Sequence, residues 1–194
     1  MLKKYLLILL IILCGSCFKT QSQNTAKIHI QPSSVLSIKG STNINKFTCK
    51  FNTAVLKGES TVHYTVEEND IIFSEATLIL KNDCFDCGKK MITKDFRELI
   101  KAETYPEITL TLKALKPSKT EPNITYALID FDIAGVTQSY KIPMAIETEN
   151  VIKASGALSL NIRDFNLENP KKAFGLIKID DVVTILFELD ITMV

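Results

Sequence analysis

The sequence predicts an all-β fold, in which antiparallel strands form a sandwich or a barrel with one short helix. Apolar and polar residues alternate along most of the chain, and short turn-forming segments separate the alternating runs. The chain has 194 residues, 46% of them hydrophobic, and a formal net charge of +1. Such a chain can bury one sizeable core and is too apolar to remain disordered.

Seven stretches show the pattern of strands. The last is the clearest, because every second residue from Val183 to Met193 is apolar, and Leu186 alone breaks the pattern on the other face. Residues 71–80 and 124–134 are apolar on both faces in places, so we expect these strands to be covered on both sides. In chain order the predicted strands are 61–66, 71–80, 108–113, 124–134, 139–147, 152–163 and 183–193.

One segment has helical spacing instead. Asp95 and Glu98 form an acidic capping pair, and the apolar residues that begin with Phe96 share one helical face. Pro106 cannot continue a helix. The predicted helix therefore runs roughly over residues 95–103.

The first residues resemble the leader of an exported protein. Two lysines precede an apolar run, residues 5–13, that is much shorter than the ~20 residues of a membrane-spanning helix. Gly15 and Ser16 directly before Cys17 resemble a bacterial lipobox, in which that cysteine is acylated, although Cys14 occupies the position where an aliphatic residue is usual. A lipid anchor at Cys17 and plain cleavage by a signal peptidase are both open.

The leader predicts three segments. They are a signal peptide over residues 1–16, a polar linker over 17–25 and a β domain over 26–194. We expect an exported protein, either free in the periplasm or held at the membrane by N-terminal lipidation. No membrane-spanning segment is expected after processing.

Export places Cys49, Cys84 and Cys87 where disulfides persist. Three is an odd number, so at most one bridge forms among them. Two residues separate Cys84 from Cys87, a spacing found in redox and zinc sites, but zinc would need a second pair of ligands. A structural disulfide, buried free thiols and a catalytic or metal site are all open at this stage.

Composition argues against several function classes. A near-neutral chain lacks the excess of Lys and Arg that nucleic-acid binding requires. Two histidines and seven glycines leave little material for acid–base, metal or phosphate-loop chemistry, and no Gly-x-Ser-x-Gly elbow is present. We therefore predict a protein that is not an enzyme and has no metal or cofactor. An outer-membrane barrel also alternates, but the absence of Trp and of aromatic girdles opposes it.

Five segments in order resemble the YceI-like family of lipid- or polyisoprenoid-binding proteins, and together they span about residue 35 to the C-terminus. No single segment is decisive, but their common order and spacing make the resemblance fairly specific. The segments are 40–49 (Gly-Ser-Thr-Asn-Ile-Asn-Lys-Phe-Thr-Cys), 86–88 (Asp-Cys-Gly) with Met91, 95–99 (Asp-Phe-Arg-Glu-Leu) running into 105–108 (Tyr-Pro-Glu-Ile), 133–136 (Ile-Ala-Gly-Val), and 164–167 (Asp-Phe-Asn-Leu) through Pro170 to 174–178 (Phe-Gly-Leu-Ile-Lys).

This resemblance implies an extended lipocalin-like antiparallel β-barrel of about eight strands with one short α-helix, exported from bacteria. It also implies an apolar interior that holds a long isoprenoid or fatty chain. Cys87 occupies the family's Cys-Gly position, so the resemblance favours a disulfide between Cys49 and Cys87 and makes Cys84 an additional cysteine.

Candidate ligand-binding residues are the apolar side chains on the inward face of the predicted strands, together with two aromatic residues of the connector 164–175, which could fold over a mouth of the barrel. Each of them could instead be an ordinary core residue. The candidates are Leu110, Leu112, Ile142, Met144, Leu158, Leu160, Ile185 and Phe187 from the strands and Phe165 and Phe174 from the connector.

Small and basic residues suggest two further features. Ala154 and Gly156 on an inward face leave volume open or mark a bend. Arg163 or the pair Lys171-Lys172 could meet a phosphate head at the rim, or could be ordinary solvated charges.

Three functions follow as hypotheses. The first is a binding protein for an isoprenoid or another long-chain lipid. The second is a filled barrel that acts as a structural or interaction protein of the cell envelope without a ligand. The third is a thiol oxidoreductase that uses Cys84 and Cys87. A homodimer is open in each case.

Overall fold

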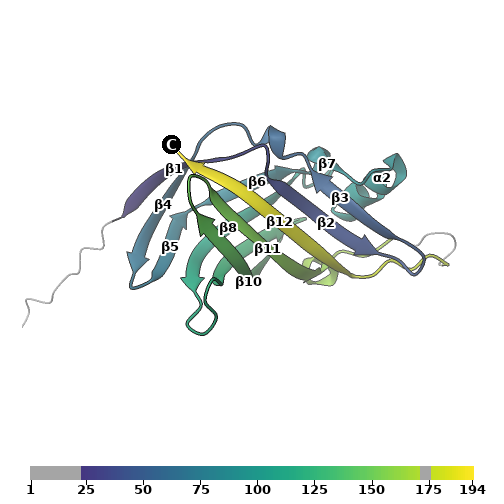
Figure 1. The fold of residues 1–194 in the computed structure, drawn as a ribbon. Helices are drawn as coiled ribbons and strands as arrows, with labels where there is room; N and C mark the ends of the chain where they lie inside the picture. The colour runs from purple at the N-terminus through teal and green to yellow at the C-terminus, as the bar shows by residue number, and fades with distance from the viewer. Residues whose placement is uncertain (1–22, 171–175) are drawn as a thin grey trace, which may run out of the picture.

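The computed structural model describes residues 23–170 and 176–194 (Figure 1). In this part of the chain one α-helix, α2 (Lys90–Leu99), accompanies the strands and the short 3-10 helices η1 (Thr53–Val55), η2 (Asn82–Cys84) and η3 (Ile162–Phe165). The strands are β1 (Asn24–Ile30), β2 (Val35–Ser41), β3 (Lys46–Phe51), β4 (Ser60–Glu67), β5 (Asp70–Glu75), β6 (Thr77–Lys81), β7 (Phe85–Asp86), β8 (Glu107–Pro117), β9 (Thr125–Ile133), β10 (Val136–Thr148), β11 (Ile152–Asn161) and β12 (Val182–Met193).

Eight of the strands close into a ring. Their order is β1, β4, β5, β8, β9, β10, β11 and β12, and β12 pairs again with β1. Every neighbouring pair is antiparallel. The predicted all-β fold with about eight antiparallel strands and one short helix is therefore confirmed.

The ring is complete at only one end, because two long strands change partners along their length. The last residues of β12 pair with β1, whereas its residues 184–188 pair with β2. Residues 114–115 of β8 pair with β5, whereas residues 107–111 pair with β6. We call the end at which β1, β4 and β5 complete the circle of strands the ring end. The opposite end, where β6, β2, β3, β7 and α2 lie, is the α2 end (Figure 1).

The main core fills the α2 end. Phe96 in α2 and Ile100 directly after it pack into a cluster with buried aromatic residues from four other elements, β3, β7, β9 and η3. The ring of Phe85 lies 5.2 Å from that of Phe96 and 5.0 Å from that of Phe51, measured between centroids. These apolar side chains occupy the inner face of the sheet, so the inner face is the apolar one. Cys49, Phe85, Phe131, Leu160, Phe165 and Leu167 are among its most buried members.

The helix begins earlier than predicted. It starts at Lys90, so Asp95 lies inside it and does not cap it, and the predicted start is wrong. Gly88 has a φ of +78°, which turns the chain between β7 and the helix, and Thr93 accepts a hydrogen bond from the backbone of that turn. Lys101, with a φ of 53°, adopts the left-handed conformation that ends the helix.

Residues 71–80 form two strands and not one. The chain breaks at Ala76, which lies between β5 and β6, because these strands pair with different parts of β8. The prediction that this stretch is covered on both sides is also wrong, because Ile79 on the outer face is 49% exposed. In β9 every residue is buried or partly buried, and on the outer face the ammonium group of Lys141 lies 3.9 Å from the centroid of the Tyr126 ring.

The N-terminal strands were not among the predicted ones. β1 begins at Asn24, two residues inside the segment expected to be a linker, and β2 and β3 follow it. Much of the predicted leader, with Cys17, lies outside the described residues, as do Phe174 and Lys171-Lys172. Within the residues that are described, no helix has the length and apolarity to cross a membrane.

Candidate ligand-binding site

The described candidate residues all lie in the two apolar clusters inside the sheet. The larger cluster occupies the α2 end and extends along the strands, and the smaller one is formed by Ala127, Met144 and Ala154 nearer the ring end. Phe187 packs against both clusters and so connects them. Leu110, Ile142, Leu158, Leu160, Phe165, Ile185 and Phe187 belong to or contact the larger cluster, and Leu112, Met144 and Phe187 the smaller.

Burial divides the candidates into two groups. Phe165, Ile142 and Leu160 are 0%, 1% and 3% exposed, because other side chains of the protein surround them. Met144, at 8%, is also buried. The remaining described candidates are only partly buried, although they lie on the same inner face; they are Leu110, Leu112, Leu158, Ile185 and Phe187.

The inner-facing side chains of β12 are less enclosed than those at the α2 end. Along β12 the inner-facing side chains are all partly exposed, and none reaches the burial of Phe165. Hydrogen bonds from β12 to its neighbours close the wall behind these side chains. Their exposed surface therefore borders the interior of the ring or its open end. The side chains are Val183, Ile185, Phe187, Leu189 and Ile191.

Gly156 does not leave open volume, contrary to one of the two sequence interpretations. It lies directly opposite Phe187 in the pairing of β11 with β12. A Cβ atom at this glycine would lie 2.6 Å from Cζ of Phe187 and 3.0 Å from the carbonyl oxygen of Pro143. The aromatic ring therefore occupies the place of the missing side chain, an arrangement that stabilises glycine within a sheet.

Several residues near the ring end escaped the sequence-based selection. Leu115, Ile146 and Leu189 pack against the smaller cluster. Tyr64 and Phe73, opposite each other in β4 and β5, have ring centroids 6.0 Å apart. Ile146 and Leu189 continue the same period-two alternation as the chosen residues, so that signal could have found them. The bulge before Ala114 shifts the phase in β8, which hid Leu115.

A polar contact adjoins the buried aromatic residues at the α2 end. The hydroxyl of Tyr140 donates a hydrogen bond of 3.1 Å to the carboxylate of Asp164, and the side chain of Gln138 donates one of 2.9 Å to the carbonyl of the same residue. Burial, together with the hydrogen bond to Asp164, raises the pKa of Tyr140 to about 12. The rings of Phe131 and Phe165 lie 5.5 Å and 6.3 Å from that of Tyr140. These contacts hold η3 against the end of the sheet.

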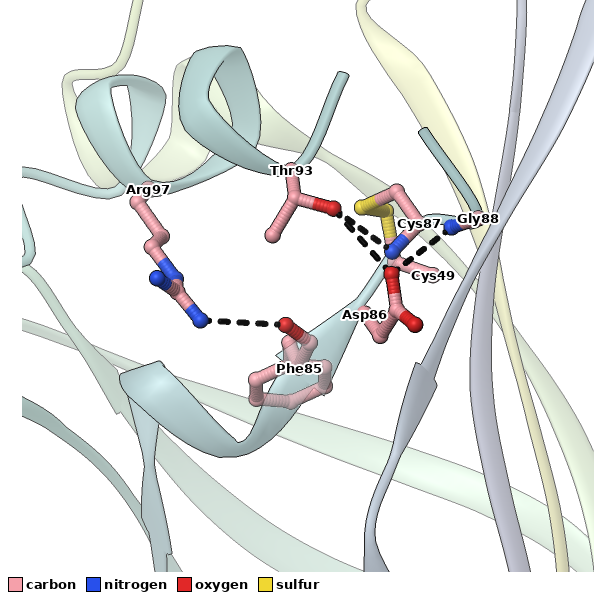
Figure 2. The surroundings of a disulfide bond; sticks show 7 residues. All are labelled: Cys49, Phe85, Asp86, Cys87, Gly88, Thr93 and Arg97. Atoms are coloured by element: carbon pink, nitrogen blue, oxygen red, sulfur yellow. Dashed lines mark hydrogen bonds between the residues drawn. A yellow bond between two sulfur atoms is a disulfide. The ribbon is translucent and has the colours of Figure 1, made fainter. Parts of the chain in front are cut away.

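A disulfide joins Cys49 in β3 to Cys87 directly after β7 (Figure 2). It attaches the segment before α2 to the sheet. Side chains of the helix then bind the free edge of β7, because Thr93 accepts a hydrogen bond of 3.0 Å from the N–H of Cys87 and Arg97 donates one of 3.5 Å to the carbonyl of Phe85. The helix thus takes the place of a neighbouring strand.

Cys84 is the free cysteine of the described residues. Burial raises the pKa of its thiol above the ordinary value, and a hydrogen bond of 3.4 Å to Asp83 raises it further. A redox-active cysteine needs a lowered pKa. Cys87, the partner that the oxidoreductase hypothesis requires, is bonded to Cys49. The geometry therefore does not support thiol chemistry at this pair.

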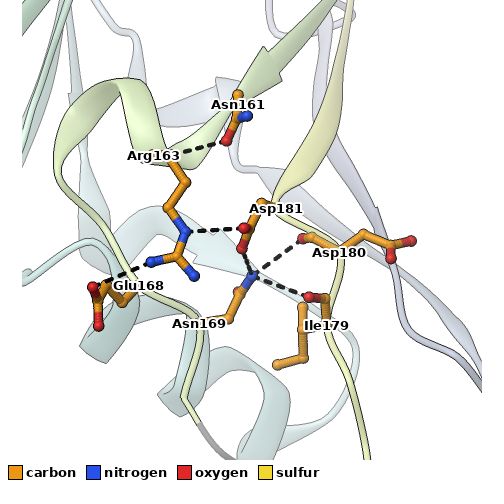
Figure 3. Close-up of polar contacts among 7 residues, drawn as sticks. All are labelled: Asn161, Arg163, Glu168, Asn169, Ile179, Asp180 and Asp181. Atoms are coloured by element: carbon orange, nitrogen blue, oxygen red, sulfur yellow. Dashed lines mark hydrogen bonds and ion pairs between the residues drawn. The ribbon is translucent and has the colours of Figure 1, made fainter.

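Arg163 already has two carboxylate partners (Figure 3). Its Nε lies 2.9 Å from Asp181 and its Nη1 lies 3.2 Å from Glu168. Hydrogen bonding from the guanidinium group of Arg163 holds the pKa of Asp181 below its ordinary value. The Nδ2 group of Asn169 donates to Asp181 at 2.8 Å and to two backbone carbonyls, those of Ile179 and Asp180. This network ties Glu168 and Asn169 to the start of β12, so Arg163 is not free for a phosphate group.

A separate cleft of about 1160 Å³ lies between α2 and residues 83–88. Acidic and basic side chains line it, among them Asp83, Asp86, Lys90 and Lys94. Charged walls do not suit a hydrocarbon chain, so this cleft is not the site for an apolar ligand. Among residues 23–170 and 176–194, no three His, Cys, Asp or Glu side chains form a group that could hold a metal ion.

Comparisons with solved structures reveal the same fold in several proteins. A polyisoprenoid binding domain from Saccharophagus degradans, implicated in plant cell wall breakdown, matches with a TM-score of 0.62 and 14% identity, over 87% of this chain and 99% of that one. BcnA of Burkholderia cenocepacia matches with a TM-score of 0.57 and 19% identity, over 84% and 99%. A mutant Campylobacter jejuni YceI protein with a monobromobimane guest matches with a TM-score of 0.51 and 17% identity, over 61% and 71%.

Sequence comparison assigns the family. No curated protein matches the chain. The family model of the YceI-like domain matches residues 21–191, which include almost every described residue. This chain therefore belongs to the family of proteins with a YceI-like domain.

Proposed function

We propose that this protein binds a long apolar ligand, such as a polyisoprenoid or a fatty chain, inside the ring of strands. The observation that carries the proposal is the partly exposed apolar inner face of β12 and the strands around it. A soluble protein gains stability by burying such side chains, so an inner face that stays partly exposed is suited to a hydrocarbon partner.

Desolvation supplies the binding energy. Each five-carbon isoprenoid unit that leaves water contributes on the order of 4 kcal/mol, at about 0.8 kcal/mol per carbon. The loss of translational and conformational freedom offsets part of this gain. An apolar lining with room for the chain is sufficient, and no charged partner is required.

The two groups of candidate residues have different roles in this proposal. Phe165 and Leu160 form the closed floor at the α2 end, since the protein's own side chains already cover them, and Ile142, which is opposite Ala127 on the wall, is covered as well. The ligand enters from the ring end and contacts the partly exposed group. In our proposal its contacts are Leu110, Leu112, Leu158, Ile185 and Phe187, with Leu115, Ile146 and Leu189 closer to the opening.

Family membership supports the same function. The Saccharophagus degradans domain with this fold is a polyisoprenoid binding domain. We extend the proposal to export, with residues 1–16 as signal peptide and Cys17 as the site of lipidation. In the same proposal the protein acts by binding and not by catalysis.

A filled ring without ligand is the second candidate. Its supporting observation is that Phe187 occupies the space left by Gly156, so part of the interior is closed by the protein itself. A filled interior and a ligand site predict opposite responses when a large side chain is added.

The test uses tryptophan, which the chain lacks. Leu158→Trp places an indole on the inner face of β11, and Ser159→Trp places it on the exposed outer face of the same strand. Delipidated protein is titrated with a dansyl-labelled farnesyl or fatty-acid chain, and binding to the wild type and to both variants is measured from the rise in dansyl emission when the probe enters an apolar site. In the two variants, energy transfer from tryptophan to dansyl also reports how close the probe lies to residue 158 or 159. We expect saturable micromolar binding to the wild type and to Ser159→Trp, and binding weaker by at least about tenfold in Leu158→Trp.

Stability separates the two candidates. If the interior holds space, the free energy of unfolding of Leu158→Trp should lie within about 1 kcal/mol of the wild-type value. If the core is filled, overpacking should lower the free energy of unfolding by about 1–3 kcal/mol. Absence of saturable binding to the wild type, together with that loss of stability, would contradict the ligand proposal and support the filled ring. Native mass spectrometry of protein purified without delipidation then identifies any lipid that accompanies it.

A further inference from the structure

Charge is distributed very unevenly along this chain. The first 58 residues contain eight lysines and no Asp or Glu, and the remaining residues contain 15 basic and 22 acidic side chains. The N-terminal part is therefore strongly basic although the whole chain is nearly neutral. Such an asymmetry is typical of proteins that contact a polyanion or an anionic surface.

The basic residues gather on one face of the β2–β3 hairpin. Lys39, Lys46 and Lys50 are exposed, and the register places all three on the outer side, with Lys39 diagonal to Lys46 and to Lys50. The alternate residues of both strands, such as Ile38 and Cys49, face the core. Among the described residues, no carboxylate forms an ion pair with any of these three lysines.

Two carboxylates border this face and keep their charge, but they are fewer than its lysines and each is held by neutral hydrogen-bond donors. Asp86, opposite Lys50, accepts hydrogen bonds from the N–H of Gly88 at 2.9 Å and from Thr93 at 3.3 Å. Asp180 accepts a hydrogen bond from the hydroxyl of Ser41. Glu188 lies opposite Val35, at the end of β2 away from the turn. The face around the turn is thus dominated by lysine.

Two exposed apolar side chains project beside the lysines. Ile44 in the turn of the hairpin is 60% exposed, and Leu176 in the neighbouring connector is 75% exposed. In Figure 1 the turn lies at the end of the molecule away from the β4–β5 turn. Lys46 follows Ile44 by two residues, and Lys178 follows Leu176 by two residues, so each apolar side chain is accompanied by a basic one.

Hydrogen bonds hold the hairpin turn, residues 42–46, against residues 176–178, and we call these two segments together the tip. Asn43 donates from its backbone to the carbonyl of Lys178 at 3.0 Å, accepts from the N–H of Lys178 at 2.9 Å and donates from its side chain to the carbonyl of Leu176 at 3.0 Å. The hydroxyl of Thr42 accepts from the N–H groups of Ile44 and Asn45. These bonds order the backbone of the tip in advance, so binding through its apolar side chains costs little conformational entropy.

We propose that this tip docks on the surface of an anionic phospholipid bilayer. Ile44 and Leu176 insert at the boundary between headgroups and acyl chains, and Lys39, Lys46, Lys50 and Lys178 contact the anionic headgroups. Apolar insertion flanked by lysine is the combination that binds a bilayer surface, whereas a soluble polyanion would need the lysines alone. The inference does not depend on what the ring holds, so the two proposals can fail separately.

The experiment again uses the absence of tryptophan. Ile44→Trp places a single reporter at the tip in the full chain, and Val66→Trp, at a residue 53% exposed in β4, is the matched control. Each variant is mixed with vesicles of phosphatidylethanolamine and phosphatidylglycerol, or with vesicles of phosphatidylcholine alone. Any attachment through residues 1–22 is common to both variants, so the emission of the reporter isolates the tip.

We expect the emission of Ile44→Trp to shift to the blue on the vesicles with phosphatidylglycerol, and brominated acyl chains to quench it. Val66→Trp should not respond. Neutralising Lys39, Lys46 and Lys50 with glutamine in the Ile44→Trp chain should weaken partitioning roughly fivefold for each lysine, and on the order of 100-fold for all three. High salt should have a similar effect.

Three results would overturn the proposal. One is an unshifted emission of Ile44→Trp on the anionic vesicles, and another is an equal shift on phosphatidylcholine. The third is partitioning that the three glutamine substitutions leave unchanged. The wild type could bind heparin while the emission of Ile44→Trp does not change on vesicles. In that case the face with Lys39, Lys46 and Lys50 is a site for a soluble polyanion, and the membrane assignment is wrong.

Discussion

Truncating two phenylalanines should measure how differently the two ends of the interior are packed. Phe165 is 0% exposed at the α2 end, whereas Phe187 is partly exposed in the middle of the ring. Phe165→Ala removes a fully enclosed ring and should lower the free energy of unfolding by about 3–5 kcal/mol. If the proposed ligand site lies beside Phe187, Phe187→Ala enlarges space that is already open, its cavity contribution is small, and we expect a loss of about 1–2 kcal/mol.

The assay is urea unfolding of delipidated protein, followed by far-ultraviolet circular dichroism. Val66→Ala, at an exposed residue, is the control and should change the free energy of unfolding by less than about 0.5 kcal/mol. Equal losses for Phe165→Ala and Phe187→Ala would refute the reasoning, because they would mean that the middle of the ring is as tightly filled as the α2 end.

Gly156 provides a second measurement on the same ring. Its Cβ position lies 2.6 Å from Cζ of Phe187, so Gly156→Ala should cost about 1–3 kcal/mol in the wild type. In the Phe187→Ala background the main clash is gone, and the same substitution should be close to neutral, since glycine is itself unfavourable within a strand. A cost that is identical in both backgrounds would show that the carbonyl of Pro143, at 3.0 Å, is the obstacle instead.

Two further predictions concern the cross-links of the α2 end. Replacing Cys49 and Cys87 by serine should lower the free energy of unfolding by roughly 4 kcal/mol, given their separation of 38 residues, whereas Cys84→Ser should leave it nearly unchanged in the same urea assay. The pKa of Asp181 is lowered in the folded state by Arg163, so its stabilising contribution is present above the unfolded pKa of about 4 and is lost as the pH falls through the lowered folded value. Asp181→Asn should therefore be less stable than the wild type near pH 7, and the difference should shrink in acid; a difference that is constant with pH would contradict this account.

The sequence alone determined the fold class and the inner face. Alternation with period two specifies which side of a strand is apolar, and that information is local. It was sufficient to place the eight candidates from the strands in or against the apolar clusters, and Phe165, chosen from the connector, is buried there as well. The resemblance to the YceI-like family indicated the pairing of Cys49 with Cys87 that the structure contains. The start of the helix was misplaced, because the turn at Gly88 and the contact of Thr93 involve residues outside the helical pattern.

Only the tertiary structure decided which inner residues are enclosed and which border open space. Leu160 and Leu189 have the same type of position in the pattern, yet Leu160 is 3% exposed, whereas Leu189, which packs against the smaller cluster, is partly exposed. The difference arises because the α2 end receives side chains from α2, η3 and the β2–β3 hairpin, while the ring end receives none of these. How tightly an inner side chain is packed depends on the residues across the ring, which are far away in the sequence. A period-two pattern is local and carries no information about those residues.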